Sequence, residues 1–439
     1  MDRRTDGIAK NTGRAALAAA GLAPGVRAAG SDEIRVGLLG CGGRGSGAVR
    51  HCLAADPGVV VVALADLFPD KARKLRDALL KDPKYKNRIR VPDDAIFGGF
   101  DCYEQLAKSD THLLLMATAP AFRPWEMMAA IQAGKHVFTE KPIATDVAGC
   151  RLFMEASRLA EQKGLAIVAG TQRRHEFNRI ELMKRIHDGA IGELVGGQCY
   201  WFGGGIWYRG RDWEMTEFEW QCHNWYHFTW LSGDQICEQH IHNIDVLNWC
   251  FNGPPKKFTA VGGRATRDYS EQAKKVAQAF GRPDDWAKYN GDIWDHIVSE
   301  FEYPNGARCL SFCGHGPGTD RSNEKIVGTK GVSDCARRIL DHKGGKIWEY
   351  EGPSVNGQEQ EHVDLIRSIR AGKPINHGIR IAESTLTAIG GRIAAYTGRT
   401  FTWDWLLNAS KNALVPDPSK WKPGPGLFFP IPNGAAPLE

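Results

Sequence analysis

Three side chains of this 439-residue chain have the types and the spacing needed to take a proton from a hydroxyl group. Glu238 and His242 are four residues apart in a segment with helical character, so their side chains are expected to share one helix face. An imidazole titrates near neutral pH and can accept a proton. The ammonium group of Lys141 can stabilise the alkoxide that forms. These residue types suit the oxidation of a carbinol, in which His242 can take the proton and Lys141 can stabilise the charge; their assignment to these roles comes from the resemblance described below.

Such a reaction also needs a hydride acceptor, and the segment from residue 34 to 45 predicts one. An apolar stretch, Ile34–Leu39, has the length of a buried strand, and a segment with helical spacing comes after the loop Gly40-Cys41-Gly42-Gly43-Arg44-Gly45. This order fits the G-x-G-x-x-G pattern, in which the glycines permit a tight turn, a close approach to a diphosphate and close helix packing. The phosphates are expected over the helix N-terminus, which favours anions.

The residue at the end of the next expected strand, Asp66, indicates which dinucleotide is bound. A carboxylate at this place suits the 2′-hydroxyl of an adenosine ribose and repels a 2′-phosphate. NAD is therefore the expected cofactor. NADP is the alternative, because Lys71 and Arg73 lie close by in the sequence and could accommodate a phosphate.

These residues require a scaffold, and the alternation of strands and helices up to about residue 170 predicts a doubly wound parallel sheet. The segment Thr118-Ala119-Pro120 follows a strand end, where such sheets bind ligands. The expected strands are 34–39, 59–65, 112–117, 136–139 and 166–169, the expected helices are 69–80, 125–133 and 148–163, and 81–100 is expected to be an irregular connection.

From residue 171 the pattern changes to an α+β domain with an open, largely antiparallel or mixed sheet and helices on one face. Expected helices are 178–188, 234–251, 359–371 and 379–396, expected strands are 193–202, 257–262, 293–303, 307–313 and 324–329, and 264–292 is expected to cross the surface. The predicted division is 1–30 as an export signal or tail, 31–170 as the nucleotide-binding domain, 171–405 as the substrate domain and 406–439 as a proline-rich tail.

Three segments, together with the glycine loop, resemble the glucose–fructose oxidoreductase/inositol dehydrogenase/MocA family over about residues 33–405. They are Glu140-Lys141-Pro142, Gln172-Arg173-Arg174-His175 and the run from Gly233 to Asp245. The resemblance implies a Rossmann domain, bound NAD and a sugar-like substrate, and it extends to exported members that act on sugars or glycosides. The implied cofactor contacts are Gly40, Gly42, Gly43, Arg44, Gly45, Asp66, Thr118, Pro120, Glu140 and Lys141.

The resemblance also implies roles in the second half of the chain. His242 matches the family's catalytic histidine, Glu238 stands where an aspartate is usual, and His240 stands where a glycine is common. The candidate substrate contacts are Gln172, Arg174, His175, Trp225, Tyr226, His240 and Asp245. Asp245 could instead make a structural hydrogen bond. A metal bound by Glu238, His240 and His242 is disfavoured, because two histidines at that spacing on one helix point apart.

An aromatic segment from Trp201 to Trp230 favours a sugar as the substrate, because flat rings beside polar groups suit the faces and hydroxyl rims of sugars. The alternative is packing or a subunit interface. Three functions remain open: an NAD-dependent oxidoreductase for a sugar, cyclitol or glycoside; a redox-neutral glycosidase that retains NAD; and a non-catalytic NAD-binding protein.

Composition excludes several other classes. The net charge of +5 is mild and no basic run occurs, so neither nucleic acid nor a membrane surface is an expected partner. The 11 cysteines include no C-x-x-C pair, which argues against a disulfide framework. The arginine pair Arg3-Arg4 before an alanine-rich stretch resembles a twin-arginine export signal, which predicts a periplasmic or secreted protein, with a cytoplasmic one as the alternative. A homo-oligomer is expected.

Overall fold

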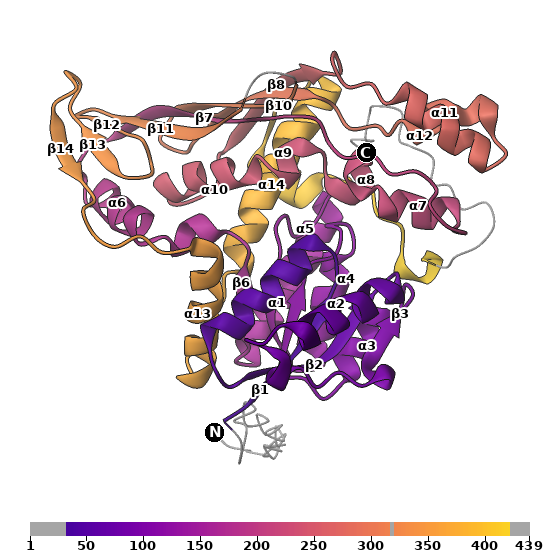
Figure 1. Ribbon diagram of the computed structural model, residues 1–439. Helices are drawn as coiled ribbons and strands as arrows, with labels where there is room; N and C mark the ends of the chain where they lie inside the picture. The colour runs from indigo at the N-terminus through magenta and orange to yellow at the C-terminus, as the bar shows by residue number, and fades with distance from the viewer. Residues whose placement is uncertain (1–31, 317–319, 422–439) are drawn as a thin grey trace, which may run out of the picture.

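The computed structural model describes residues 32–316 and 320–421, and its first half forms a parallel sheet of six strands in the order β3-β2-β1-β4-β5-β6 (Figure 1). The strands are β1 (Ile34–Leu39), β2 (Val59–Asp66), β3 (Ile96–Gly98), β4 (Leu113–Met116), β5 (His136–Thr139) and β6 (Ile167–Ala169). Both faces carry helices, namely α1 (Gly43–Ala55), α2 (Pro69–Lys81), α3 (Cys102–Lys108), α4 (Arg123–Gln132) and α5 (Val147–Gln162). The apolar strands need cover on both sides, which confirms the predicted doubly wound sheet.

The edge strand β3 lies in the stretch for which the sequence predicts only an irregular connection. Its three residues pair in parallel with Leu64–Asp66 of β2. All three are half-buried, so they show no apolar alternation that a sequence pattern could reveal.

The second half forms a mixed sheet of nine strands in the order β14-β13-β12-β11-β7-β10-β9-β8-β15. Its neighbours pair antiparallel except β7 and β10, which run parallel, so the predicted open sheet is confirmed. The strands are β7 (Leu194–Gly203), β8 (Lys257–Gly263), β9 (His296–Glu302), β10 (Arg308–His315), β11 (Arg321–Gly328), β12 (Val332–Ser333), β13 (Arg338–Leu340), β14 (Lys346–Glu349) and β15 (Phe401–Thr402).

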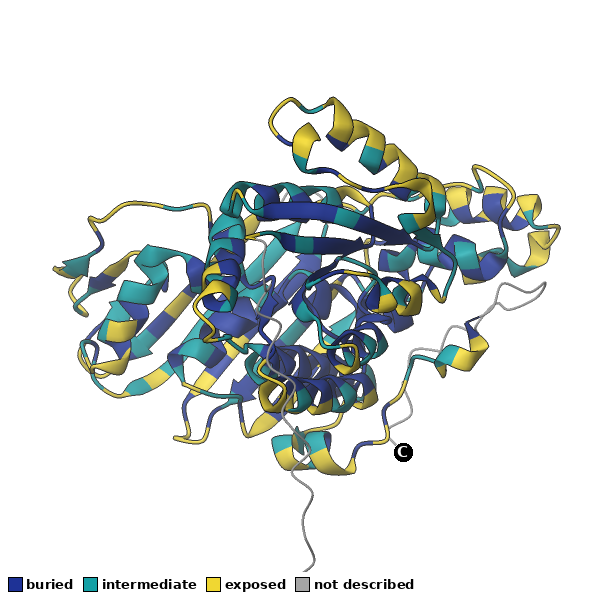
Figure 2. Ribbon diagram, turned by 90° about the horizontal axis from the view of Figure 1, so that it is seen from below, coloured by how far each residue is buried: buried dark blue, intermediate teal, exposed yellow. Residues whose placement is uncertain are grey.

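Helices cover one face of this sheet and join it to the parallel sheet. They include α6 (Phe177–His187), α9 (Gln235–Glu238), α10 (Ile241–Cys250) and α14 (Gly378–Thr397), and α14 packs on α5 as well as on β8 and β9 (Figure 1). The chain from Glu217 to Ser232 forms the short α7 (Glu217–His223) and α8 (Thr229–Ser232), and the predicted surface excursion holds α11 (Ser270–Ala279) and α12 (Trp286–Tyr289). Buried residues gather on the strands and on the inner helix faces. Along the outer helices, buried and exposed positions alternate (Figure 2).

The helix α13 (Gly357–Arg370) lies beside α1 and β6, although the predicted boundary at residue 170 assigns it to the second domain. Leu365 and Ile366 join the core of the parallel sheet, so this late segment completes the first domain (Figure 1). The described part of the predicted tail returns to the first domain, where Trp421 packs against Phe122 and Trp125. The predicted export signal and the end of the tail lie outside the described residues.

The argument from composition against a disulfide framework can be compared with the structure. All 11 cysteines are free in the described part of the chain. In the same part, no helix combines the length and the apolar character needed to cross a bilayer.

Candidate active site

The glycine loop between β1 and α1 has the shape of a diphosphate-binding turn. Gly40 has φ +91°, and a Cβ there would lie 2.7 Å from the backbone of Ala117. A Cβ on Gly45 would fall 1.9 Å from the carbonyl oxygen of Gly40, so α1 can pack this closely only with glycine. A Cβ on Gly42 or Gly43 would meet no atom within 4 Å, so the space above the N-terminus of α1 is open. The loop therefore fits a dinucleotide.

Asp66 ends β2 beside this loop and fixes its conformation. Its carboxylate accepts hydrogen bonds from the backbone N–H of Cys41 at 2.7 Å and of Phe68 at 2.9 Å. Burial raises the pKa of Asp66, and Lys71 opposes that shift. A carboxylate in this position can accept a ribose hydroxyl, in agreement with the expected preference for NAD.

The loop opens into a cavity of about 530 Å³ between the two sheets' domains. Lys141, Glu238 and His242 line the same cavity, so the structure brings the predicted catalytic residues together with the nucleotide loop. The other predicted residues on its wall are Gly42, Gly43, Arg44, Thr118, Glu140, Gln172 and Trp225. Further wall residues that we did not assign from the sequence are Arg123, Gln239 and Gln358.

Lys141 and Glu238 form a buried ion pair across the two domains. Lys141 Nζ donates to the backbone carbonyl of Glu238 at 2.5 Å and to Glu238 Oε1 at 3.1 Å, and each side chain is 10% exposed. Glu238 Oε2 is buried and accepts no hydrogen bond from a described residue. The ammonium group is thus fixed in position while one carboxylate oxygen remains free for a ligand.

His242 is held as a neutral base. Burial lowers its pKa well below the ordinary value of 6.5, and the nearby charges of Lys141 and Arg173 lower it further. Its Nδ1 atom is buried and without a hydrogen-bond partner among the described residues. A neutral imidazole on the wall of a cavity can accept a proton from a bound hydroxyl group.

The predicted single helix from 234 to 251 is broken, and the break decides which side chains reach the cavity. The helix α9 ends at Glu238 and α10 begins at Ile241, with Gln239 and His240 between them. His240 Nε2 lies 2.7 Å from Ser311 Oγ and 3.5 Å from Cys199 Sγ, so its ring is buried against β10 and β7 rather than on the cavity wall. Burial lowers the pKa of His240 to about 3.

Asp245 and Arg174 contact each other instead of the cavity. Arg174 Nε and Nη2 donate to the Asp245 carboxylate at 2.7 and 2.9 Å, and Ser384 Oγ donates to it at 2.8 Å. Both side chains are buried and neither belongs to the cavity wall. This arrangement corresponds to the structural alternative considered for Asp245, and it ties α10 to α14.

His175, Tyr226 and Pro120, which the sequence also offered as contacts, lie off the cavity wall. His175 Nδ1 is 2.6 Å from Asp364 Oδ2 on α13, and the Tyr226 hydroxyl is 2.9 Å from His315 Nε2. Pro120 is buried at the start of the turn before α4. The contacts of His175 and Tyr226 are thus structural and depend on segments far away in the sequence, whereas Pro120 accepts a local hydrogen bond from the backbone of Arg123.

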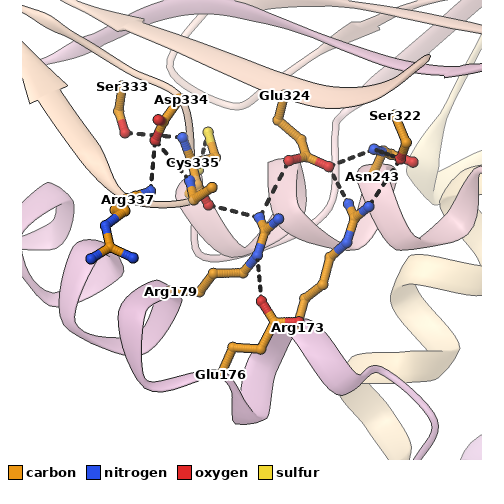
Figure 3. Close-up of polar contacts among 12 residues, drawn as sticks. Arg173, Glu176, Arg179, Asn243, Ser322, Glu324, Ser333, Asp334, Cys335 and Arg337 are labelled. Carbon is orange, nitrogen blue, oxygen red and sulfur yellow. Dashed lines mark hydrogen bonds and ion pairs between the residues drawn. The ribbon is translucent and has the colours of Figure 1, made fainter. Parts of the chain in front are cut away.

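A charged network behind the cavity positions the start of α10 (Figure 3). Glu324 on β11 is buried and forms ion pairs with Arg173 and Arg179, and it also accepts a hydrogen bond from Asn243 Nδ2 at 2.5 Å. Asn243 follows His242 directly, and Arg173 follows Gln172. The network therefore fixes two neighbours of cavity residues to the sheet.

Arg44 of the glycine loop is also fixed by acidic side chains. Its Nε donates to Glu140 Oε1 at 2.5 Å, and its Nη2 donates to Glu361 Oε1 at 3.2 Å. Burial raises the pKa of Glu361, and Glu140 raises it further. Glu361 is on α13, so a helix distant in sequence supports the loop.

The aromatic segment is mostly core. Trp207 and Trp225 line the cavity, whereas Phe218, Trp220 and Trp230 belong to a buried cluster with Phe122. Most rings of this segment therefore pack in the core, which was the alternative to sugar binding. Of the wall residues that we missed, Arg123 follows Thr118-Ala119-Pro120 by three residues and Gln239 lies within the run from Gly233 to Asp245, so both had a signal nearby. Gln358, near the start of α13, had none.

No group of three or more His, Cys, Asp or Glu side chains that could hold a metal occurs within the residues described. The set weighed as a metal site, Glu238, His240 and His242, is separated by the break between α9 and α10, because His240 points to the sheet.

Known proteins that resemble this chain fall into one group. Residues 34–171 match the model of an oxidoreductase family with an NAD-binding Rossmann fold, Gfo/Idh/MocA, and residues 180–333 match the Gfo/Idh/MocA C-terminal domain. An inositol 2-dehydrogenase/D-chiro-inositol 3-dehydrogenase of Shouchella clausii is 28% identical over 219 residues, 50% of this chain and 53% of that protein. A glycosyl hydrolase family 109 protein of Streptomyces coelicolor is 30% identical over 211 residues, 44% of this chain and 41% of that protein. The chain thus spans about half the length of the curated relatives it matches.

Solved structures share the fold at low sequence identity. An aldose–aldose oxidoreductase from Caulobacter crescentus, crystallised with glycerol, has a TM-score of 0.61 at 17% identity, over 84% of this chain and 99% of that one. GenD2 from gentamicin A biosynthesis, in complex with NAD, also has a TM-score of 0.61, at 15% identity, over 85% of this chain and 97% of that one. The two matched domains together span more than half of the sequence, and the chain therefore belongs to the Gfo/Idh/MocA oxidoreductase family, with an NAD-binding Rossmann domain.

Proposed function

We propose that the protein is an NAD-dependent oxidoreductase that acts on a secondary hydroxyl group of a sugar, a cyclitol or a glycoside. One observation carries the proposal: the open glycine loop and the set of Lys141, Glu238 and His242 line the same cavity. The relatives named as inositol dehydrogenases and the aldose–aldose oxidoreductase support polyhydroxylated substrates.

The residues of the chain divide the work of the reaction. His242 is neutral and accepts the hydroxyl proton, while the Lys141 ammonium stabilises the negative charge that develops on the oxygen. Glu238 fixes Lys141 and leaves one carboxylate oxygen for a neighbouring hydroxyl group. Bound NAD supplies the acceptor for the hydride. Trp225 and Gln172 on the cavity wall offer an apolar surface and an amide for the rest of a sugar ring.

The first experiment identifies the nucleotide that the protein carries. The purified protein is denatured, the supernatant is analysed for NAD and NADP, and the native protein is then mixed with NAD and a panel of cyclitols and sugars. Formation of reduced cofactor with at least one member supports the proposal. Lys141→Ala and His242→Ala variants that turn over as fast as the parent would remove the proposed mechanism.

A redox-neutral glycosidase is the second candidate, because one relative is named a glycosyl hydrolase family 109 protein. In this chemistry the ring hydroxyl is oxidised transiently, the adjacent C–H becomes acidic, and the aglycone leaves by elimination. Water then adds, and the retained hydride returns to the ring. The distinguishing observation is aglycone release from p-nitrophenyl glycosides without net reduced cofactor, together with deuterium uptake from solvent at the adjacent carbon.

We also propose that the protein forms a homo-oligomer through the outer face of the mixed sheet. Val261, Val298, Phe312 and Tyr200 lie in register across β8, β9, β10 and β7, and the exposed Val261 (67%) and Leu310 (40%) belong to the same face. A sheet face of this composition is better covered than solvated. Light scattering coupled to gel filtration tests this proposal, and a monomer at micromolar concentration would contradict it.

A further inference from the structure

The second domain contributes side chains to the region next to Asp66, where a dinucleotide places its adenosine half. Phe68 follows Asp66 by two residues, and its ring makes edge contacts with Trp213 (5.6 Å between centroids) and His223 (5.9 Å). Trp213 and His223 belong to residues 204–230, which we call the covering segment. It approaches the parallel sheet from the mixed-sheet domain, near α2 and β3 (Figure 1).

The covering segment also forms part of the cavity wall. Trp207, Arg209, Cys222 and His223 line the same cavity as Gly42 and Gly43 of the nucleotide loop. The segment therefore faces the nucleotide across the cavity, and the ring contacts with Phe68 hold it against the first domain.

Two cations on this wall form no direct ion pair with a described carboxylate. Lys71 Nζ lies over the Phe68 ring at 4.4 Å, and the Arg209 guanidinium lies over the Trp207 ring at 4.3 Å. Among residues 32–316 and 320–421 the charge of Asp66 acts on Lys71 and that of Asp212 acts on Arg209, both without direct ion-pair contact. Burial and the charges of both cations lower the pKa of His223 to about 4; its Nδ1 is 3.3 Å from Arg209 Nη1, and its Nε2 is 3.7 Å from Asp212 Oδ2.

The position of Arg209 is fixed before any ligand binds. Its backbone N–H donates to Asn224 Oδ1 at 2.8 Å, and its carbonyl accepts from Asn224 Nδ2 at 3.1 Å and from Trp220 Nε1 at 3.2 Å. Phe218 anchors the segment by stacking on Phe100 of the first domain at 4.7 Å. The segment thus presents its cation from a rigid support, which lowers the entropy cost of binding.

We propose that the covering segment completes the cofactor site: Arg209, with Lys71, binds a phosphate group at the adenosine half of the dinucleotide, and the contacts with Phe68 slow its release. This inference rests on the proposed function, since it assumes that the cavity holds the nucleotide. The phosphate belongs either to the diphosphate of NAD or to the 2′-phosphate of NADP, and these two sources differ in the test below.

The test measures nucleotide dissociation from the full-length protein, independently of turnover. NADH or NADPH is bound, an excess of the oxidised form is added in a stopped-flow instrument, and the loss of energy transfer from tryptophan to the reduced nucleotide gives the rate. The Lys71→Met and Arg209→Met double variant should release nucleotide about tenfold faster or more, because charged hydrogen bonds are removed. Trp213→Ala, at a side chain that is 42% exposed, should also speed release.

Matched controls separate this effect from general damage. Lys74→Met removes the same charge from the exposed side of α2, and Trp348→Ala removes a half-buried tryptophan on β14 that packs with Arg185, away from the covering segment; both should release nucleotide at the parent rate. If Arg209→Met does not fold, as judged by thermal unfolding without nucleotide, Lys71→Met alone carries the test. A larger effect on NADPH than on NADH assigns the cations to the 2′-phosphate, and equal effects assign them to the diphosphate.

Two results overturn the inference and can be told apart. If the parent binds NADH or NADPH but the variants release it within twofold of the parent rate, the covering segment plays no part in binding. If the parent binds neither nucleotide, the proposed function fails together with the inference.

Discussion

Replacing His242 with asparagine tests the proposed chemistry most directly. Asparagine keeps a polar, though smaller, side chain and has no group that titrates in the working range. A positioned general base contributes about 10²- to 10⁴-fold to the rate. The variant should therefore lose this factor in kcat/KM, which corresponds to a barrier increase of about 2.7–5.5 kcal/mol.

The structure also predicts the pH dependence of the parent. The base is active only when neutral, and burial together with Lys141 and Arg173 lowers the pKa of His242 well below 6.5. The acidic fall of kcat/KM in the parent should thus lie below pH 6.5. In His242→Asn this acidic fall should be absent, because the group that causes it has been removed.

The assay is kcat/KM against pH with the substrate that the sugar panel identifies, with NADH binding measured by tryptophan energy transfer in parallel. His342→Asn, at an exposed histidine away from the cavity, is the control and should behave as the parent. Unchanged NADH affinity in His242→Asn shows that the cofactor site is intact. A loss below tenfold with the acidic fall retained would refute the role of His242 as the base.

Three further predictions concern the glycine loop, the buried pair of Asp245 and Arg174, and the N-terminal arginine pair. Gly45→Ala should abolish nucleotide binding, since the new Cβ would lie 1.9 Å from a backbone oxygen, whereas Gly47→Ala, 3.6 Å from its nearest neighbour, should copurify with nucleotide like the parent. Asp245→Asn should lower the free energy of unfolding by about 3–5 kcal/mol at pH 7 in urea titrations, because it leaves the buried Arg174 without its counter-charge. Burial raises the pKa of Asp245, but Arg174 holds it below the ordinary value of 3.8 in the folded protein. The stabilisation is therefore complete above pH 3.8 and is lost as the pH falls through the lower pKa of the folded state. The stabilities of parent and variant should converge in that acidic range. Lysines in place of the arginine pair at positions 3 and 4 should keep the protein in the cytoplasm on cell fractionation, and continued export would contradict the twin-arginine proposal.

Contiguous motifs allowed the sequence to predict the nucleotide domain and the first half of the site. The strand β1, the glycine loop with Gly42 and the helix α1 follow one another directly along the chain. Asp66 is the last residue of β2, and Lys141 follows β5 of the same sheet. In a parallel sheet the carboxyl ends of neighbouring strands meet at one edge, so local patterns were enough to place these groups near one another.

The sequence alone specified the parallel sheet, the glycine turn and the residue types for proton and hydride transfer, because each depends on short-range periodicity and on backbone sterics. Only the tertiary structure decided which of the motif side chains face the cavity. The break at Gln239 directs the His240 ring to the mixed sheet, and Asp245 forms an ion pair with the distant Arg174. Such choices depend on which distant segment offers a buried polar group its partner, since an unpaired buried group costs more than any local preference gains.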